Sequence, residues 1–391
     1  MFRFTTIKDY HAVLQAGEKS CVQVVDYYLD QISQQQHLNS FLEVFAQEAK
    51  QRAIELDQAR SSNMPLGKLH GVVVGIKDVL CYDGHKVTAA SKILENYSAV
   101  YSATAIEKLL AAGAIIIGRQ NCDEFAMGSS NENSAFGPVK NALDPTKVSG
   151  GSSGGSAVSV QANLCMISLG SDTGGSVRQP ADFCGVVGLK PSYGRISRYG
   201  LIAYASSFDQ IGIFSKSVAD AALVLEVIAG SDNFDSTVST KPVPAYSNEI
   251  ASELVPKKVA YFKETLSHPG LDKEIKKQIE DYLEQLKSKG YIVEAIDFTL
   301  LDYIVPAYYV LTTAEASSNL SRFDGIKFGH RTKQPIKDLT ELYKLSRTEG
   351  FGAEVQRRIL LGTFVLSAGY FDAYFTKAQQ IRKLLVDGAT Q

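Results

Sequence analysis

Two segments rich in glycine and serine contain the residues best suited to chemistry. They are residues 149–156 (SGGSSGGS) and 170–176 (GSDTGGS). Such composition is usual in flexible linkers, but each segment adjoins an apolar element inside an α/β pattern, where a linker has no place. Glycine allows positive φ angles and close approach of the backbone to a ligand, and successive N–H groups in such loops bind anions. We therefore predict a constrained functional loop at each segment.

The sequence around these segments disfavours several kinds of site. Neither segment fits the phosphate-binding patterns G-x-x-x-x-G-K-[ST] or G-x-G-x-x-G. Residues 150–154 match G-x-S-x-G, but a nucleophile elbow directly follows a buried strand, and the preceding residues 141–147 (NALDPTK) are typical of a loop. A Ser-His-Asp triad also needs a later histidine, and the two available, His268 and His330, stand in polar surroundings. That mechanism is the weaker alternative.

With histidine scarce, Lys77 is the candidate base for a serine nucleophile. It ends the apolar run 72–76 (VVVGI), and a lysine at the end of a buried strand cannot stay charged without a partner. A desolvated lysine that loses its charge can serve a serine as base. A salt bridge with Asp78 or another carboxylate would explain the same residue, and this segment alone leaves both interpretations open.

A metal site would need histidine, cysteine or carboxylate ligands at recurrent spacing. The one local cluster of such residues consists of His70, Asp78, Asp83 and His85. We expect this cluster to lie in a solvated loop, and we expect no catalytic metal.

The elements that must position these residues predict an α/β fold. Apolar residues recur at helical spacing over residues 6–60, which we expect to form an outer helical layer. From Gly71 onward, short β-rich runs alternate with helical stretches, which is typical of βαβ units and a mostly parallel buried sheet. The expected strands are 72–74, 114–117, 165–169 and 186–189, and the expected helices are 105–112, 157–163 and 218–228. A second α/β passage has expected strands at 259–262 and 291–296 and helices at 272–289 and 351–385.

The composition is that of a globular protein. The chain has 391 residues, of which 45% are hydrophobic, and a formal net charge of -2, which excludes disorder, collagen and coiled coil. It has no basic block that would indicate a nucleic-acid surface, and no apolar stretch near the roughly 18 residues of a membrane-spanning helix. The five cysteines form no C-x-x-C pair and are typical of reduced structural thiols. We expect a cytoplasmic protein outside the membrane.

Three features together resemble the amidase signature family: Lys77, the glycine and serine run with Ser152, and residues 170–181 (GSDTGGSVRQPA). The resemblance covers nearly the whole chain. It implies a three-layer α/β/α fold whose central mixed, mostly parallel sheet is covered by helices on both faces. It also implies a single domain over residues 1–391. Its expected parts are an N-terminal helical layer (1–60), a catalytic core (65–230) and a second α/β part (250–391) that looks incomplete at the C-terminus.

This resemblance gives each motif residue a role. It implies that Ser176 is the acyl-forming nucleophile, Ser152 a bridging serine with a cis peptide bond, and Lys77 the ultimate base. The residues alone do not choose between the two serines. The backbone N–H groups of Thr173, Gly174 and Gly175 precede Ser176 and can form an oxyanion hole. The resemblance further implies that no metal or organic cofactor serves this half-reaction.

Further motifs are similar to those of the glutamine-hydrolysing subunits of tRNA-dependent amidotransferases. They are residues 190–200 (KPSYGRISRYG), 206–210 (SSFDQ), 314–325 (AEASSNLSRFDG) and 349–352 (EGFG). The similarity implies that free glutamine is hydrolysed and that the ammonia passes to a partner, the B subunit. That partner would activate misacylated Glu-tRNA(Gln) or Asp-tRNA(Asn) with ATP and magnesium. The C subunit would brace the pair, and tRNA would be bound mainly through the B subunit.

Recognition of glutamine requires a cation for its α-carboxylate, and a guanidinium suits that task. Arg358 resembles the family's carboxylate-binding arginine, with Arg357 as the alternative, and a surface salt bridge would explain either residue. Tyr309 resembles a pocket tyrosine, with Tyr308 as the alternative and core packing as the structural explanation. Relatives continue beyond this chain's Gln391 with an acidic residue for the substrate ammonium, so we expect an incomplete pocket.

Two other functions fit the sequence. One is a freestanding amidase that acts on another small amide. The other is a non-catalytic assembly protein that binds its partners but does not turn over glutamine.

Overall fold

The computed structural model describes residues 4–62, 64–250 and 257–390. The chain divides into two compact units, one formed by Met1–Ile250 and Glu315–Leu360, the other by Ala251–Ala314 and Leu361–Gln391. Residues 315–360, which the sequence analysis assigned to the second α/β part, belong instead to the first unit. Helices α11 (Ile304–Leu320) and α13 (Ala353–Val365) each contribute residues to both units.

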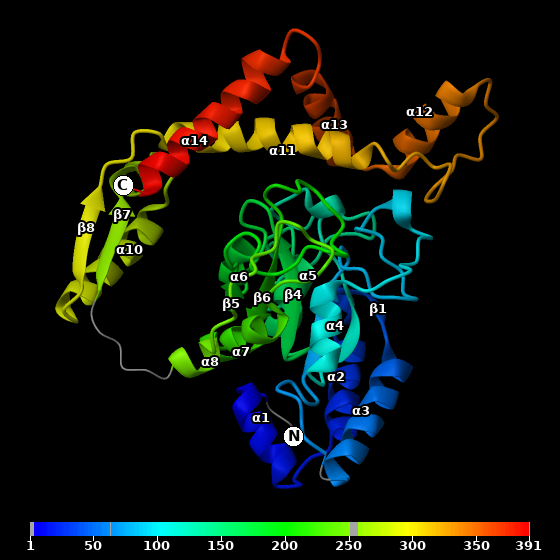
Figure 1. The fold of residues 1–391 in the computed structure, drawn as a ribbon, viewed down its shortest axis with the longest axis vertical. Coiled ribbons are helices and arrows are strands. Elements are labelled where there is room, and N and C mark those ends of the chain that lie inside the picture. The colour runs from blue at the N-terminus through cyan, green and yellow to red at the C-terminus, as the bar shows by residue number, and fades with distance from the viewer. Residues whose placement is uncertain (1–3, 63, 251–256, 391) are drawn as a thin grey trace. The chain divides into compact units, whose positions relative to one another are not determined.

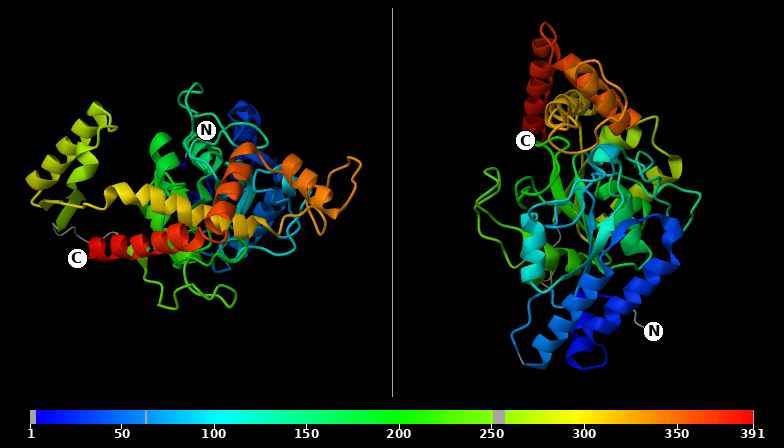
Figure 2. Two further views of the ribbon diagram at one scale, coloured as in Figure 1. Left: turned by 90° about the horizontal axis from the view of Figure 1, so that it is seen from above. Right: turned by 90° about the vertical axis from the view of Figure 1, so that its right-hand side faces the viewer.

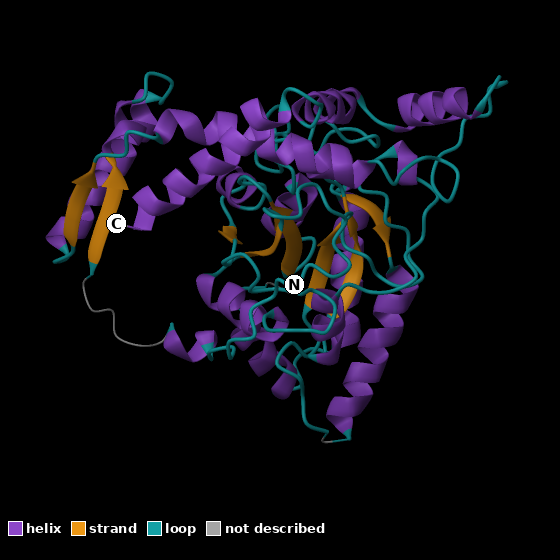
Figure 3. Cartoon of the chain, turned by 45° about the horizontal axis from the view of Figure 1, so that its top comes forward, coloured by secondary structure: helices purple, strands orange, loops and turns teal. Residues whose placement is uncertain are grey.

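The first unit is built on a six-stranded sheet flanked by helices (Figures 1 and 3). Its strands, in the spatial order β1-β3-β2-β4-β6-β5, are β1 (Phe41–Val44), β3 (Ile115–Gln120), β2 (Val73–Lys77), β4 (Ile167–Asp172), β6 (Gln210–Ser215) and β5 (Val187–Leu189). Strands β2, β3, β4 and β6 are buried along their whole length. Burial on both faces explains why β2 and β3 begin as continuous apolar runs rather than as alternating patterns.

The sheet is mixed, as expected. Strand β2 pairs in parallel with both β3 and β4, whereas the pairings β1 with β3, β4 with β6 and β5 with β6 are antiparallel. Four of the six described strands therefore run in one direction, but the parallel pairings are confined to β3-β2-β4. Because the carboxyl ends of neighbouring parallel strands meet at one edge of a sheet, the residues that end β2 and β4 are brought together.

The predicted helices of the first unit and the edge strand β5, expected at 186–189, are confirmed, whereas strands β1 and β6 were not predicted. Helix α7 has the predicted bounds, and helices at 105–112 and 157–163 are confirmed within a few residues. Strand β1 was missed, because residues 6–60 were expected to be helical throughout and four residues at a sheet edge show no clear period. The described helices are α1 (Ile7–Gln15), α2 (Cys21–Gln34), α3 (Ala46–Ser61), α4 (Thr104–Ala111), α5 (Gly154–Gln161), α6 (Arg178–Phe183), α7 (Val218–Ile228), α8 (Tyr246–Glu249) and α12 (Leu339–Gly350).

Local sequence explains where several of these helices begin. Helix α2 opens with a capping box, in which the Ser20 side chain accepts from the Gln23 N–H and the Gln23 side chain accepts from the Ser20 N–H. The Ser217 hydroxyl caps α7 by accepting from the Asp220 N–H. Helices α2 and α3 pack side by side and, with α1, form the predicted N-terminal helical layer at one end of the first unit (Figures 1 and 2).

The second unit contains a two-stranded parallel sheet of β7 (Lys258–Phe262) and β8 (Ile292–Ile296), joined through α10 (Lys273–Ser288). These three elements confirm the predicted strands 259–262 and 291–296 and the predicted helix 272–289, whereas the predicted helix 351–385 is interrupted after Val365. The unit also contains α9 (Lys263–Ser267), the π-helix at Asp372–Thr376 and α14 (Lys377–Thr390). In the part of the chain that the structure describes, no helix has the length and apolar character needed to cross a bilayer.

Candidate active site

Lys77 ends strand β2 and is fully buried. Its Nζ donates hydrogen bonds to Ser152 Oγ at 2.7 Å and to Ser171 Oγ at 2.9 Å. Within the described residues, no carboxylate forms an ion pair with this ammonium group. The structure thus joins Lys77 to the first glycine and serine segment through a hydroxyl, which favours the base over the salt-bridge interpretation.

Asp78, the alternative partner for Lys77, is engaged elsewhere. Its carboxylate accepts hydrogen bonds from Arg119 Nη1 at 2.6 Å and from the Thr88 and Ala90 N–H groups at 2.9 and 2.8 Å. The Asp78 charge is therefore neutralised by Arg119 on the neighbouring strand β3, and it fixes the loop after β2. Asp78 supports the position of Lys77 without sharing its proton.

Burial lowers the pKa of Lys77, because the charged ammonium loses its hydration. The negative charges of Asp123 and Asp172 act in the opposite direction. The net shift is toward a neutral amine, which is the form that can accept a proton. A buried lysine with a lowered pKa and a hydrogen bond to Ser152 fits the predicted role of a base that acts through this serine.

The loop that carries Ser152 is tightly packed. The Gly151–Ser152 peptide bond is cis, as the family resemblance implied. The Ser152 carbonyl accepts from the Asp123 N–H at 3.0 Å, and the Gly151 N–H donates to Gln179 Oε1 at 2.9 Å. A Cβ at Gly151 would lie 2.2 Å from Asp123 Oδ2, so only glycine fits there. The predicted constrained backbone of this segment is confirmed.

Ser176 lies in the loop between β4 and α6 and is 8% exposed. Its carbonyl accepts from the Ser153 N–H at 3.3 Å, which places the two glycine and serine segments against one another. The Asp172 carboxylate shapes this loop by accepting from the Val177 N–H at 3.1 Å and from Arg178 Nε at 3.1 Å. The structure therefore brings Ser176 to the same edge of the sheet as Lys77 and Ser152.

The three residues predicted to form an oxyanion hole are not equivalent. The Gly175 N–H donates to Asp172 Oδ1 at 2.8 Å and is therefore engaged. Among the described residues, the N–H groups of Thr173 and Gly174 donate no hydrogen bond to the protein. The donors that this conformation leaves available to a developing negative charge are thus on Thr173 and Gly174.

Ser171 is a site residue that the sequence analysis did not single out. Its hydroxyl accepts from Lys77, and its carbonyl accepts from Ser153 Oγ at 3.1 Å. It lies in the quoted segment 170–176, at the end of the strand beside β2. Its role follows from strand pairing, because parallel strands β2 and β4 bring Lys77 and Ser171 together.

The structure distinguishes Arg358 from Arg357. Arg358 is buried, its Nη1 donates to the Tyr204 hydroxyl at 2.9 Å, and its Nε donates to Glu354 at 2.8 Å. The Arg357 side chain is 71% exposed and pairs with Glu354. The Arg358 charge also acts on Asp123, which contacts the Ser152 loop. Burial raises the pKa of Asp123, and the positive charges of Lys77 and Arg358 offset part of this rise.

Tyr309 lies in the part of α11 that belongs to the second unit and is 42% exposed. Its ring contacts that of Tyr308 edge-on, with centroids 5.5 Å apart. Lys77, Ser152, Ser176 and Arg358 all belong to the first unit. The pocket role of Tyr309 therefore stays a prediction from the resemblance, as does the choice between Tyr308 and Tyr309.

The cluster of His70, Asp78, Asp83 and His85 is only partly the solvated loop that we expected. Asp83 is exposed in a turn, but His70 and Asp78 are buried, and His85 stacks on Tyr82 and lies 3.0 Å from Glu48. The expectation was wrong for Asp78 because the loop after β2 folds over its carboxylate, which accepts from the Thr88 and Ala90 N–H groups. The described residues contain no group of three or more side chains arranged to hold a metal ion. The five cysteines are buried free thiols, as predicted.

Comparison with known proteins agrees with this arrangement. The family described as Amidase matches residues 23–391. The A subunit of glutamyl-tRNA(Gln) amidotransferase from Chlorobium phaeobacteroides is 52% identical, over 98% of this chain and 80% of that protein. The crystal structure of the glutamyl-tRNA(Gln) amidotransferase A subunit from Thermotoga maritima superposes with a TM-score of 0.77 at 38% identity, over 99% of this chain and 76% of that one.

A solved enzyme that acts on a different kind of amide is similar at lower identity. The native peptide amidase from Stenotrophomonas maltophilia superposes with a TM-score of 0.79 at 28% identity, over 96% of this chain and 78% of that one. All of these proteins share the α/β architecture with a central mixed sheet. Since the family match extends from residue 23 to residue 391 and one relative is identical at half of the aligned positions, this chain belongs to the amidase family.

Proposed function

We propose that this chain is the glutamine-hydrolysing component of a tRNA-dependent amidotransferase, the one that corresponds to the A subunit. The observation that carries the chemistry is the buried hydrogen bond between Lys77 and Ser152. The similarity to the glutamyl-tRNA(Gln) amidotransferase A subunits of two organisms supports the substrate and the biological role. A freestanding amidase is less favoured, because the sequence identity to peptide amidase, 28%, is lower than the 52% and 38% to the two A subunits.

The proposed reaction begins when Ser176 Oγ attacks the side-chain amide carbon of glutamine. Its proton passes to Ser152, whose own proton moves to neutral Lys77. The N–H groups of Thr173 and Gly174 stabilise the tetrahedral oxyanion. The C–N bond then breaks, and the proton returns through Ser152 to the departing ammonia. Water hydrolyses the acyl-enzyme by the same relay, which releases glutamate and restores Ser176.

Glutamine is held, in this proposal, by Arg358 at its α-carboxylate, and the pocket role of Tyr309 stays a prediction from the resemblance. A buried guanidinium suits a carboxylate because it offers two parallel donors. The proposed hydrolysis uses no metal and no organic cofactor in this chain. ATP and magnesium belong to the transamidation step on the B subunit.

The proposed partners are the B and C subunits in a cytoplasmic heterotrimer. The B subunit takes the ammonia and activates misacylated Glu-tRNA(Gln) or Asp-tRNA(Asn). The net charge of this chain is -2, which favours tRNA binding mainly through that partner, because phosphate neutralisation needs an excess of cationic side chains.

The test is ammonia release from glutamine by this chain, alone and with the B and C subunits. Ser176→Ala should abolish release, whereas Ser288→Ala, at the end of α10, should leave it unchanged. Partner-stimulated release that depends on Ser176 would support the proposal. Hydrolysis of other small amides without partner stimulation would support a freestanding amidase. Partner binding by a chain whose Ser176 is not sulfonylated by a sulfonyl reagent would support a non-catalytic assembly protein.

A further inference from the structure

The loop formed by residues 204–209 connects the two parts of the site that must cooperate. At one end of this loop, the Tyr204 hydroxyl accepts from Arg358 Nη1 at 2.9 Å, and the guanidinium also lies over the Tyr204 ring. At the other end, Asp209 Oδ1 accepts from the Thr173 hydroxyl at 2.6 Å. The loop thus touches both the proposed carboxylate-binding arginine and the proposed oxyanion loop.

The two carboxylate oxygens of Asp209 accept hydrogen bonds from different donors. Oδ1 takes the bond from Thr173, while Oδ2 accepts from the Tyr204 and Ala205 N–H groups at 2.9 and 3.0 Å. We propose that Asp209 is a positioning residue that holds Thr173 and Arg358 in register, so that glutamine's carboxylate and its reacting amide are fixed together. This inference rests on the proposed function.

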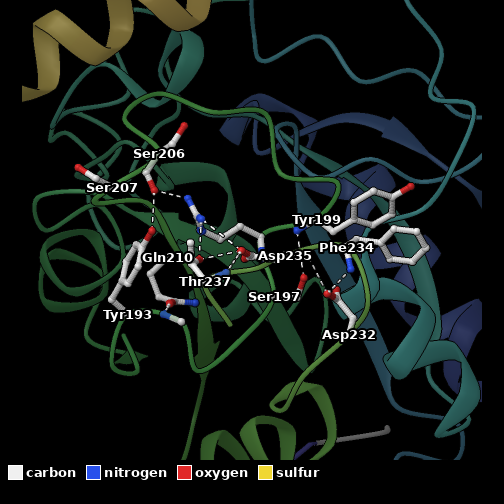
Figure 4. Close-up of polar contacts among 12 residues, drawn as sticks. Tyr193, Ser197, Tyr199, Ser206, Ser207, Gln210, Asp232, Phe234, Asp235 and Thr237 are labelled. Atoms are coloured by element: carbon white, nitrogen blue, oxygen red, sulfur yellow. Dashed lines mark hydrogen bonds and ion pairs between the residues drawn. The ribbon is translucent and has the colours of Figure 1, made fainter. Parts of the chain in front are cut away.

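The loop is also held from outside, so a displacement of Asp209 is not absorbed by free movement. The Tyr193 hydroxyl donates to the Ser206 carbonyl at 3.0 Å, as Figure 4 shows, and Arg198 donates to the same carbonyl. The Ser207 N–H donates to Glu315 Oε2 at 2.9 Å, and Asn319 Nδ2 donates to the Tyr204 carbonyl at 3.2 Å. A site residue held by such a second layer of contacts is pre-organised.

The chemistry of Asp209 also favours a specific role. It is buried and, among the described residues, forms no ion pair with an arginine or lysine. Burial raises the pKa of its carboxyl, and three hydrogen bonds offset this rise only in part, so that the pKa is about 6. A buried carboxylate without a cation is costly. An ordinary packing position would be better filled by an uncharged residue, whereas a rigid acceptor for three donors requires both oxygens.

The test uses the assembled complex and three variants that separate the two connections. Tyr204→Phe removes the bond to Arg358 and should raise KM for glutamine about 3- to 10-fold with kcat within twofold. Thr173→Val removes the bond to Asp209 and should lower kcat about 10-fold with KM within threefold. Asp209→Asn should do both. Asp209→Asn combined with Tyr204→Phe should raise KM no further than Asp209→Asn alone, because both act on one connection.

A matched control distinguishes positioning from loss of a buried acid. Asp220 is likewise buried and accepts from the Ile7 N–H at 2.9 Å, so Asp220→Asn should alter thermal stability and leave kcat and KM unchanged. Butyramide, which lacks the α-carboxylate, should lose less kcat/KM than glutamine in Asp209→Asn. Equal losses for both amides would overturn the inference.

The single variants keep the inference testable if Asp209→Asn does not fold. A kcat effect without a KM effect in Tyr204→Phe, or the reverse in Thr173→Val, would then overturn it. A wild-type complex that releases no ammonia from glutamine would refute the proposed function itself and the inference with it. An active wild type whose variants fail to show these separate effects would overturn the inference alone.

Discussion

Lys77 and Ser152 share a buried hydrogen bond of 2.7 Å, although they lie 75 residues apart. The bond depends on the placement of two other charges. Asp78, adjacent to Lys77, pairs with Arg119, and Asp172, at the end of β4, pairs with Arg178. Because these two carboxylates have cationic partners and no carboxylate of the described residues forms an ion pair with Lys77, the lysine amine is bonded to hydroxyl groups. This arrangement distinguishes Lys77 from a lysine held in an ordinary salt bridge.

Replacement of Lys77 by methionine should remove the base and keep the volume. We expect Lys77→Met to lower the rate of glutamine hydrolysis by about 10²- to 10⁴-fold, the usual contribution of general acid–base catalysis. The thermal midpoint should not fall, because methionine keeps the buried volume and removes a desolvated polar amine. Activity within tenfold of wild type in a folded Lys77→Met complex would contradict the assignment of Lys77 as the base.

The two neighbouring arginines provide a matched pair of substitutions. Arg358→Lys loses the planar donor pair and the bond to Tyr204 and should raise KM for glutamine at least about tenfold, which corresponds to about 1.4 kcal/mol. Arg357→Lys alters an exposed ion pair, whose contribution is about 0–1 kcal/mol, and should leave both kcat and KM within twofold. Steady-state kinetics of the two variants side by side would decide the assignment, and the reverse pattern would transfer the role to Arg357.

The pH dependence of hydrolysis should reflect the lowered pKa of Lys77. A lysine base works when neutral, so kcat/KM should fall as the pH decreases and Lys77 takes up a proton. Since burial lowers the Lys77 pKa, this decrease should be centred below lysine's ordinary value of 10.5. Initial rates of ammonia release between pH 5 and 11 would measure it. A midpoint near 10.5 would show that Lys77 behaves as an exposed lysine.

Glu124 should make stability depend on pH. Burial raises its pKa from 4.5 to about 7, while its carboxylate accepts from Ser91 Oγ and, at 2.9 Å, from the Gly352 N–H. The folded chain therefore binds this proton more tightly than the unfolded chain, and its stability decreases as the pH rises from about 4.5 through 7. Glu124→Gln cannot titrate and lacks this decrease.

The measurement is urea unfolding of wild type and Glu124→Gln at pH 5 and pH 8. The free energy of unfolding of the variant minus that of wild type should be larger at pH 8 than at pH 5 by about 1 to 3 kcal/mol. Exposed Glu294, on β8, is a suitable control position, since Glu294→Gln should show no such difference. An equal stability difference at both pH values would mean that Glu124 has an ordinary pKa.

The sequence was sufficient for the elements whose identity is decided locally. Helix α7 has a capping serine and a helical period, and β2, β3 and β4 are apolar runs bounded by polar or glycine residues, so all four were predicted. Strands β1 and β6 were not. Strand β1 has four residues at a sheet edge, and β6 pairs antiparallel with β4 after a long irregular segment. Their pairing is decided by partners distant in sequence.

The site was predictable to the same extent. Composition and spacing identified Lys77 and both glycine and serine loops. A lysine at the end of an apolar run and repeated glycines inside an α/β pattern are unfavourable for ordinary strands and helices, so they indicate a functional site. The choice between base and salt bridge was not predictable, because it depends on Arg119, 41 residues after Asp78. Ser171 and Asp209 were missed for the same reason. Ser171 meets Lys77 only when β2 and β4 pair, and Asp209 meets Thr173 only when the loop 204–209 packs against the loop after β4.

The division of the chain into units also sets the order in which the site is synthesised. Lys77, Ser152 and Ser176 all precede Ile250, where the chain leaves the first unit, whereas Arg358 belongs to the segment that returns to it. At about 5 to 20 residues per second, the interval between Ile250 and Arg358 lasts roughly 5 to 20 s. A growing chain on the ribosome therefore contains the reactive lysine and serines for seconds before the arginine exists. The proposed catalytic residues and the arginine proposed to bind glutamine are therefore separated in the time of their synthesis as well as in sequence.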